Sequence, residues 1–180
     1  MAKLPQKYRA LTAIGVTTGC RISEILSLRR FDVLDREGRF KPEIAFLKLK
    51  TRGGTKHRSM AIPERWRKEV VRHLREEERR GWERPDDLIF RGKCGKPLSR
   101  VTVYRVFRRV MGCGYGTHWM RKTFAQEMFR EFLRERKEDP MRALELTRRA
   151  LGHARLDTTV KYLGITEASI REAQERVFGK

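Results

Sequence analysis

Apolar positions recur at helical spacing over most of the chain. Leu4, Tyr8 and Leu11 begin one such stripe, and a second runs on from Arg21 after a Thr-Gly break, so the start predicts two helices. Pro63 opens a further helix with an apolar face. The same spacing predicts later helices over residues 98–112, 118–136, 139–151, 155–162 and 166–178.

The pattern changes between Phe31 and Pro63, where short β-type runs replace the helical stripes. The runs FDVL, EIAFLKLK and RSMAI are separated by DREGRF and TRGGTKH, which contain glycines suited to positive φ. We therefore expect a three-stranded antiparallel sheet. The predicted fold class is α+β and mainly α, a helical domain with one small sheet.

The composition of the chain indicates the class of molecule that it binds. A chain of 180 residues with 39% hydrophobic residues can fill one core, so one domain is expected. Its 43 Lys and Arg residues exceed its 23 Asp and Glu residues, which gives a net charge of +20 spread along the chain. Such a field attracts a polyanion, so nucleic acid is the expected partner. Ribosomal proteins and simple helical DNA binders are equally basic, so charge alone indicates no chemistry.

Other classes of function lose support from the sequence. No apolar run approaches the roughly 20 residues of a spanning helix, and the N-terminus lacks the apolar core of a signal peptide, so we expect a cytoplasmic, DNA-associated protein without membrane contact. The three cysteines form no C-x-x-C pair, and the histidines show no H-E-x-x-H spacing. We expect no disulfide framework, metal or cofactor. His73 lies beside an apolar helix face and is expected to pack rather than bind a ligand.

Some polar residues stand at spacings that a plain surface does not require. Arg21 and Glu24 are three apart in TGCRISEILSL, where the carboxylate can hold the guanidinium, although a routine surface ion pair has the same pattern. His118 and Arg121 are three apart at a predicted helix start, where both can face one anion.

The stretch LGHARLDTTVKYLG contains the third unusual spacing. Tyr162 follows His153 by nine residues, with a turn and the pair Thr158-Thr159 between them. That interval can bring an imidazole and a phenol into one site. A buried tyrosine with a structural role is the plain alternative.

Taken in order, these pieces resemble the catalytic domain of the tyrosine recombinase (phage integrase) family. The shared features are the arginine of TG-x-R-x-x-E, a lysine in a β-hairpin, H-x-x-R, LGH and a tyrosine nine residues later, over residues 8–164 or so. The resemblance implies a site-specific recombinase or integrase that cleaves and rejoins DNA through a 3′-phosphotyrosyl intermediate without metal or ATP. A topoisomerase with the same chemistry and a non-catalytic DNA-binding relative are the alternatives, and the LGH-x8-Y spacing favours the recombinase.

The resemblance also assigns roles to individual residues. Cleavage of a phosphodiester without a metal needs a nucleophile, donors for the phosphate charge and an acid for the departing oxygen. By resemblance, Tyr162 attacks the phosphate and His118 accepts a proton in cleavage and returns it in rejoining. Arg21 and Arg121 clamp the non-bridging oxygens through planar forks. His153 donates a further hydrogen bond to the phosphate.

The general acid of the family is a lysine at the turn between the second and third strands. Lys50 stands at the end of EIAFLKLK, immediately before this turn, and is our assignment. Because TRGGTKHR is longer than the usual turn of the family, Lys56 is the alternative. Glu24 is expected to support Arg21. The predicted DNA contacts are Arg52, Lys56, Arg58 and Lys122.

Most members of the family carry a helical core-binding domain before the catalytic domain. Here only about 20 residues precede Arg21, so residues 1–180 are expected to form the catalytic domain without that N-terminal domain, as an excised fragment or a naturally short recombinase. The expected partner is double-stranded DNA, with a tetramer of protomers on paired sites and a monomer in free solution. The stripe Ile170, Ala173 and Val177 is expected to dock on a neighbouring protomer, and folding back on its own domain is the alternative.

Overall fold

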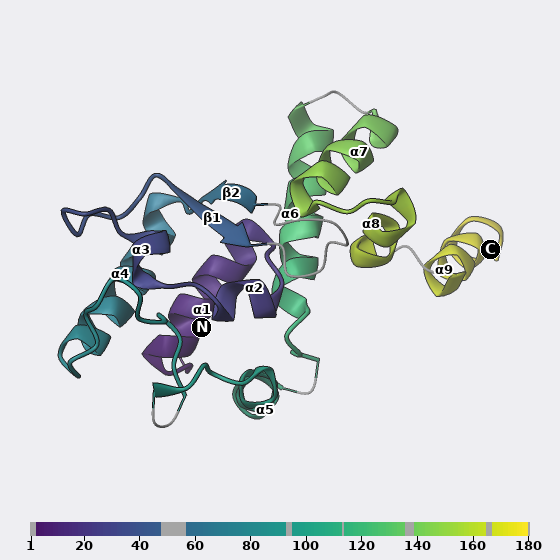
Figure 1. The fold of residues 1–180 in the computed structure, drawn as a ribbon. Helices are drawn as coiled ribbons and strands as arrows, with labels where there is room; N and C mark the ends of the chain where they lie inside the picture. Colours follow the sequence, from purple (N-terminus) through teal and green to yellow (C-terminus); the bar gives the residue numbers. More distant parts are fainter. Residues whose placement is uncertain are drawn as a thin grey trace. The chain divides into compact units, whose positions relative to one another are not determined.

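The computed structural model describes residues 3–47, 57–92, 95–112, 114–135, 139–164 and 167–179. The chain divides into two compact units, residues 1–121 and 122–180, and each is described by itself. Helices predominate in both units, with a small antiparallel sheet in the first (Figure 1). The mainly helical α+β class predicted from the sequence is confirmed.

The predicted helices are all present, with boundaries close to those expected. The first unit contains α1 (Gln6–Thr18), α2 (Ile22–Leu26), α3 (Arg30–Val33), β1 (Glu43–Leu47), β2 (His57–Ala61), α4 (Glu64–Glu78), α5 (Arg100–Met111) and the start of α6 (Trp119–Glu135). The second unit contains the rest of α6, followed by α7 (Pro140–Leu151), α8 (Leu156–Leu163) and α9 (Glu167–Phe178).

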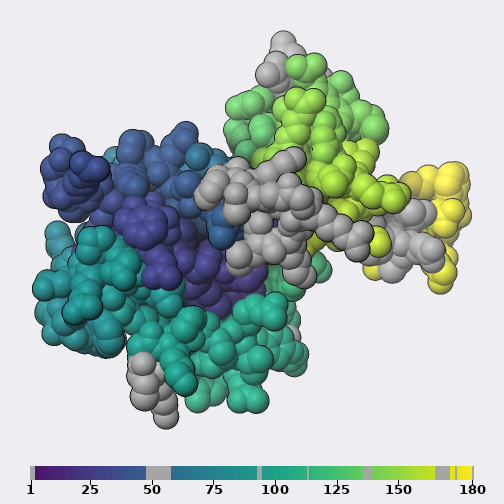
Figure 2. Space-filling view, viewed as in Figure 1, coloured from purple at the N-terminus to yellow at the C-terminus, as the bar shows by residue number. Residues whose placement is uncertain are grey.

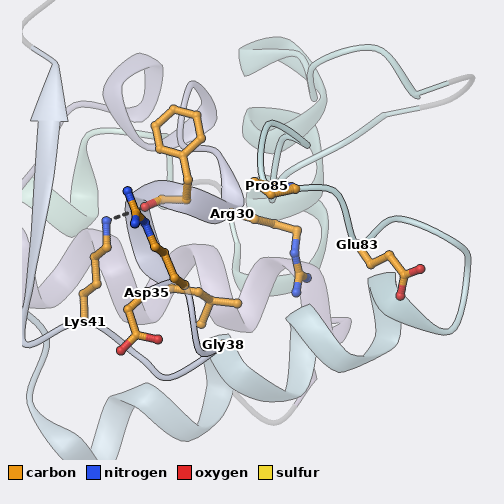
Figure 3. Close-up of a pocket in the computed structure, with 9 residues that line it drawn as sticks. Arg30, Asp35, Gly38, Lys41, Glu83 and Pro85 are labelled. Carbon is orange, nitrogen blue, oxygen red and sulfur yellow. Dashed lines mark hydrogen bonds between the residues drawn. The ribbon is translucent and has the colours of Figure 1, made fainter.

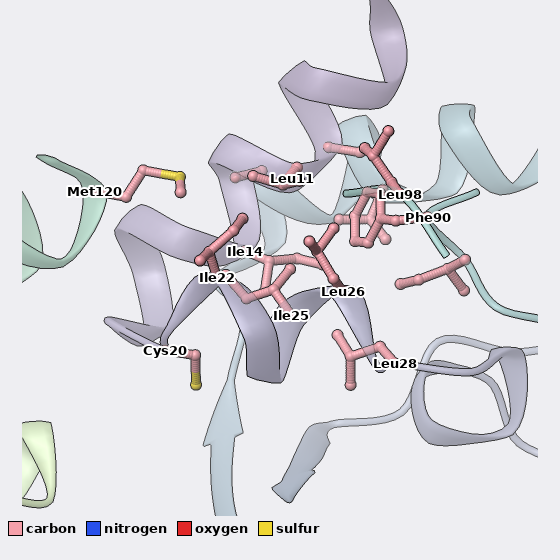
Figure 4. Packing of buried hydrophobic residues seen from close by; sticks show 14 of the residues in the cluster. Leu11, Ile14, Cys20, Ile22, Ile25, Leu26, Leu28, Phe90, Leu98 and Met120 are labelled. Atoms are coloured by element: carbon pink, nitrogen blue, oxygen red, sulfur yellow. The ribbon is translucent and has the colours of Figure 1, made fainter. Parts of the chain in front are cut away.

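The core of the first unit forms around α1, which packs against α4 and α2. Side chains of α1, of α2 and of the segment before α5 meet there, among them Leu11, Ile25 and Phe90 (Figure 4). Their burial removes apolar surface from water and so stabilises the unit. His73 also packs in this unit, stacked on Phe90 with ring centroids 5.4 Å apart, as a packing histidine should.

The sheet pairs β1 with β2 in antiparallel register, with Ala45 opposite Ser59. In β1 the side chains of Ile44 and Phe46 are buried and their neighbours are not, which is the alternation of a half-buried strand. Within the described ranges the sheet has two strands, so the prediction of three is wrong. The end of the second predicted strand, through Lys50, lies outside the described residues.

The run FDVL, predicted as the first strand, forms the short helix α3 instead. The carboxylate of Asp32 accepts a hydrogen bond of 2.8 Å from the backbone N–H of Arg29, as a capping group does at a helix start. The backbone N–H of Phe31 donates to the carbonyl of Pro85. These bonds hold the first three residues of the run in a helix, so the local context overrides their β propensity, and Leu34 at its end makes an isolated antiparallel bridge with Phe40.

The ends of the helices in the second unit follow from local chemistry. Asp139 caps α7 by accepting hydrogen bonds from two backbone N–H groups, and Pro140 occupies the first helical position. Gly152 ends α7 with φ of 65°, a left-handed conformation that glycine adopts without strain.

In the part of the chain that the structure describes, no helix is both long and apolar enough to cross a membrane.

Candidate active site

Arg21 and Glu24 lie together at the start of α2, in the first unit. One oxygen of Glu24 accepts the backbone N–H of Arg21 at 2.8 Å, and the other accepts its Nη1 at 3.1 Å. The side chain of Glu24 is 6% exposed, whereas that of Arg21 is 35% exposed. A buried carboxylate thus holds a guanidinium that reaches solvent, which is the geometry expected of a supported phosphate clamp.

Arg121 approaches the same segment from the first turn of α6. It is almost fully buried, and its Nη1 donates a hydrogen bond to the carbonyl of Gly19, two residues before Arg21. Gly19 ends α1 in a left-handed conformation with φ of 60°. The loop that carries Arg21 is therefore bonded to the second predicted clamp arginine.

Gly15 explains how the first turn of α6, within the first unit, comes close to α1. A Cβ atom at this position would lie 2.4 Å from Sδ of Met120 and 3.1 Å from its Cβ. Met120 is buried in the core of the first unit and directly precedes Arg121 (Figure 4). A residue without a side chain on α1 therefore makes room for the turn that carries Arg121.

Cys20 and Arg58 complete the surroundings of this loop. Arg58, on β2, donates hydrogen bonds to the carbonyl of Thr18 and to Sγ of Cys20, the latter at 3.4 Å. Burial raises the pKa of the Cys20 thiol, although the nearby cations of Arg58 and Arg121 act in the opposite direction. Cys20 is thus a neutral thiol, and Arg58 ties β2 to the end of α1. The predicted DNA contact of Arg58 stays a prediction.

The other predicted residues of the first unit differ in their setting. His118 is exposed in the turn that precedes α6, whereas Arg121, three residues later, is buried. Lys50, Arg52 and Lys56 lie outside the described residues. In the second unit, the predicted DNA contact Lys122 is exposed on α6.

His153 and Tyr162 lie together in the second unit. His153 follows α7 and is 5% exposed, and Tyr162 lies on α8 and is half-buried. Their ring centroids are 5.2 Å apart and their planes are inclined by 42°. The nine-residue interval thus brings the imidazole and the phenol into one site.

Thr159 binds the ring of His153 and Arg148 binds its backbone, and neither residue was assigned a role from the sequence. Oγ1 of Thr159, which is fully buried, lies 3.0 Å from Nδ1 of His153. Nη1 of Arg148 donates to the carbonyl of His153 at 2.6 Å. The Thr pair is visible in the sequence, but only the fold shows that its second member faces the imidazole.

Arg148 is itself held by Glu145, one turn earlier on α7. Its Nε and Nη2 bond both oxygens of Glu145, at 2.6 and 2.7 Å, and Arg149 adds a bond at 2.9 Å. Hydrogen bonds from Arg148 and Arg149 lower the pKa of the Glu145 carboxyl to about 2. The i,i+3 and i,i+4 spacing is the sequence signal for this cluster.

A pocket of about 560 Å³ also lies on the first unit. It is formed by α3, the loop that follows α3 and the segment around Pro85 (Figure 3), and the dark-blue and teal surfaces of these segments adjoin in Figure 2. Lys41 donates to the carbonyl of Phe31 at its edge. None of the predicted site residues lines it.

Among the described residues, no group of three or more His, Cys, Asp or Glu side chains is placed to hold a metal ion.

Comparison with known proteins identifies the family of the chain. Residues 1–168 match the phage integrase family. The chain is 29% identical over 174 residues to the probable integrase/recombinase YoeC of Bacillus subtilis (strain 168), covering 94% of this chain and 83% of YoeC. It is 30% identical over 176 residues to the tyrosine recombinase XerA of Pyrococcus furiosus, covering 93% of this chain and 54% of XerA.

Solved structures agree with this result. The recombinase XerH, bound to palindromic difH substrate in a post-cleavage complex, matches with a TM-score of 0.64 and 25% identity over 97% of this chain and 47% of XerH. The chain therefore spans about half the length of XerH and of the curated XerA. The chain belongs to the phage integrase family of tyrosine recombinases.

Proposed function

We propose that this chain is the catalytic domain of a site-specific recombinase that cleaves and rejoins double-stranded DNA through a 3′-phosphotyrosyl intermediate. The observation that carries the proposal is the contact of the Tyr162 ring with the buried His153, at the interval that the family uses. The post-cleavage complex of XerH with its difH substrate supports DNA as the substrate class. With DNA as its substrate, the protein is expected to act at the nucleoid.

The proposed reaction needs no metal and no ATP. Oη of Tyr162 forms a bond to the scissile phosphorus while the bond from phosphorus to the 5′-oxygen breaks. The phenol proton passes to His118, and Lys50 gives a proton to the departing 5′-oxygen. Rejoining reverses each transfer, because the phosphotyrosyl ester keeps the energy of the broken bond. The assignment of Lys50 over Lys56 stays a prediction.

Two arginines would stabilise the charge that develops on the phosphate. Arg21 is held by Glu24 and Arg121 by the carbonyl of Gly19, so both guanidinium groups are oriented before DNA binds. Preorganised donors stabilise a transition state without being reorganised during the reaction. Because each guanidinium is planar and forked, lysine cannot replace it at such a site.

Helix α5 offers a surface for the DNA backbone. Val103 and Phe107 anchor one of its faces in the core, and Arg105, Arg108 and Arg109 are exposed on the others. With a net charge of +20, the chain should bind phosphates with a strong dependence on salt concentration and little choice of sequence.

We also propose that four protomers assemble on paired DNA sites and that the free chain is a monomer. The net charge of +20 opposes association until DNA neutralises it. Helix α9 ends in two exposed apolar side chains, Val177 at 65% and Phe178 at 82%. Docking of this helix on a neighbouring protomer would cover them.

Trapping the covalent intermediate tests the proposed function. Incubation with a nicked suicide DNA should give a protein–DNA adduct at Tyr162, identified by peptide mapping. Tyr162→Phe should bind the same DNA normally and form no adduct, because it lacks the attacking oxygen. Tyr8→Phe is the matched control, because Tyr8 on α1 packs its ring against Phe107 and the substitution keeps that ring, and this variant should form the adduct. An adduct mapped to another tyrosine, or none in the unaltered chain, would contradict the proposal.

A further inference from the structure

We infer that Thr159 is a positioning residue that holds the ring of His153 in the tautomer with its proton on Nε2. The task of that proton at a phosphate rests on the proposed function. The choice of tautomer rests on it too, whereas the contact between the two side chains does not, and the tautomer can be measured in the protein without DNA.

The geometry restricts how these two side chains pair. Nδ1 of His153 and Oγ1 of Thr159 are 3.0 Å apart, and the two residues are 5% and 0% exposed. A hydrogen bond shielded from water in this way is not readily exchanged for one to solvent. Thr159 is β-branched and lies within α8, so its χ1 has few options, and the rotamer in the structure brings its hydroxyl to the imidazole.

The position of the proton on the His153 ring depends on whether the Thr159 hydroxyl donates to Nδ1 or accepts from it. If the Thr159 hydroxyl donates to Nδ1, the proton of the neutral imidazole lies on Nε2. An Nε2–H group can then donate to an anionic phosphate oxygen. With the proton on Nδ1, a lone pair on Nε2 would face that oxygen and repel it. The first arrangement is therefore the one that suits a phosphate site.

A second restraint acts on the backbone of the same residue. Arg148, held by Glu145, donates to the carbonyl of His153 at 2.6 Å. Helix α7 thus fixes the main chain of His153, and α8 fixes its ring through Thr159. Loss of the hydroxyl would release the ring alone, so the effect of Thr159 is separable from that of Arg148.

Nitrogen NMR of the full chain measures the tautomer directly. The unaltered protein should show a protonated Nε2 and an unprotonated Nδ1 for His153 at neutral pH. Thr159→Val should give a mixture of tautomers, and Thr159→Ser, which keeps the hydroxyl, should restore the original pattern. Thr158→Val is the matched control, because Thr158 is exposed on the same helix turn, and it should change nothing.

Covalent cleavage of suicide DNA provides the second measurement. We expect Thr159→Val to form the adduct about tenfold more slowly, the effect of one buried hydrogen bond, with DNA binding and thermal unfolding close to normal and Thr159→Ser near the unaltered rate. A proton on Nδ1, or a Thr159→Val variant with unaltered tautomer and rate, would overturn the inference. Absence of any adduct in the unaltered protein, with the tautomer as expected, would count against the proposed function alone.

Discussion

At the scale of single residues, buried polar groups hold the side chains that are predicted to meet phosphate in each of the two units. Glu24 is buried beneath Arg21, and Thr159 is buried beside His153. In each pair the buried partner fixes the orientation of the group that is expected to meet phosphate. Such support is effective because a hydrogen bond shielded from water is not readily exchanged for one to solvent.

His73 makes the stability of the first unit depend on pH. Its Nε2 bonds the carbonyl of Ile89 at 2.6 Å, and burial lowers the pKa of the imidazole, although Glu77 raises it and Lys7 lowers it further. The folded chain therefore keeps His73 neutral, while the unfolded chain takes up a proton below pH 6.5. Its contribution is present above that pH and is lost as the pH falls below it.

We expect the free energy of unfolding in urea to fall between pH 7 and pH 5, by up to about 1.4 kcal/mol per pH unit for one group. His73→Leu should have a flatter profile over this range. The carboxylates of Asp87 and Glu69, with lowered pKa values, would act only at more acidic pH. An equal slope in the variant would show that His73 is not the titrating group.

Contacts between residues close in the sequence could be predicted, and contacts between distant segments of the chain could not. The spacing of Arg21 and Glu24 indicated their contact, and the interval from His153 to Tyr162 indicated theirs. The bond from Arg121 to Gly19 joins residues far apart in the chain, which periodicity does not reveal. The role of Thr159 needed the orientation of a ring, which a sequence does not specify.

At the scale of elements, helices were predicted well because their apolar stripes are long. Helix α4, with its buried Val70 and Leu74, is an example. The four-residue run FDVL is too short for its periodicity to separate strand from helix, and its capping and its bond to the loop at Pro85 decided the outcome. The contact between Gly15 on α1 and Met120 in the first turn of α6 was also not predicted. A single glycine in a helical pattern does not indicate which residue packs against it.

Gly15→Ala should disturb the approach of α6 to α1. The new methyl group would lie 2.4 Å from Sδ and 3.1 Å from Cβ of Met120, so the Met120 side chain must move, and a shift at its Cβ would displace the neighbouring Arg121. Overpacking of a core costs about 1–3 kcal/mol, partly offset by the better helix propensity of alanine. We expect weaker stability in urea and slower adduct formation on suicide DNA.

The matched control for this substitution is Gly114→Ala. A Cβ atom there meets no other atom within 4 Å, so stability and cleavage should stay near those of the unaltered chain. Normal cleavage by Gly15→Ala would show that Met120 can move without shifting Arg121.

At the scale of the whole molecule, the chain combines a strongly basic net charge with exposed apolar side chains at the end of α9. The charge favours DNA and opposes association between free copies, whereas Val177 and Phe178 expose apolar surface that a partner could cover. Together they describe a protein whose assembly should depend on DNA. The composition predicted the charge effect, and the side chains of Ile170 and Ala173 lie outside those that the structure describes.

Deletion of residues 166–180 tests this dependence. Binding to a single DNA site should stay nearly intact, because the deletion leaves α5 and the clamp arginines in place. Cooperative assembly on paired sites should be lost, and cleavage should decrease. Gel mobility on one-site and two-site DNA separates the two effects. An unfolded truncated chain would make the helix part of its own core, and cooperative assembly without it would make it dispensable.

Because Cys20 is buried, the rate at which its thiol is alkylated can report the opening of the loop that contains it. Its thiol lies between Gly19, which accepts the Arg121 bond, and Arg21, and burial both shields the sulfur and raises its pKa. An alkylating reagent can modify it only when this loop opens and a thiolate forms. The alkylation rate of the peptide containing Cys20 therefore reports how often this loop opens. If Arg21 and Arg121 bind phosphate as proposed, bound DNA should lower that rate.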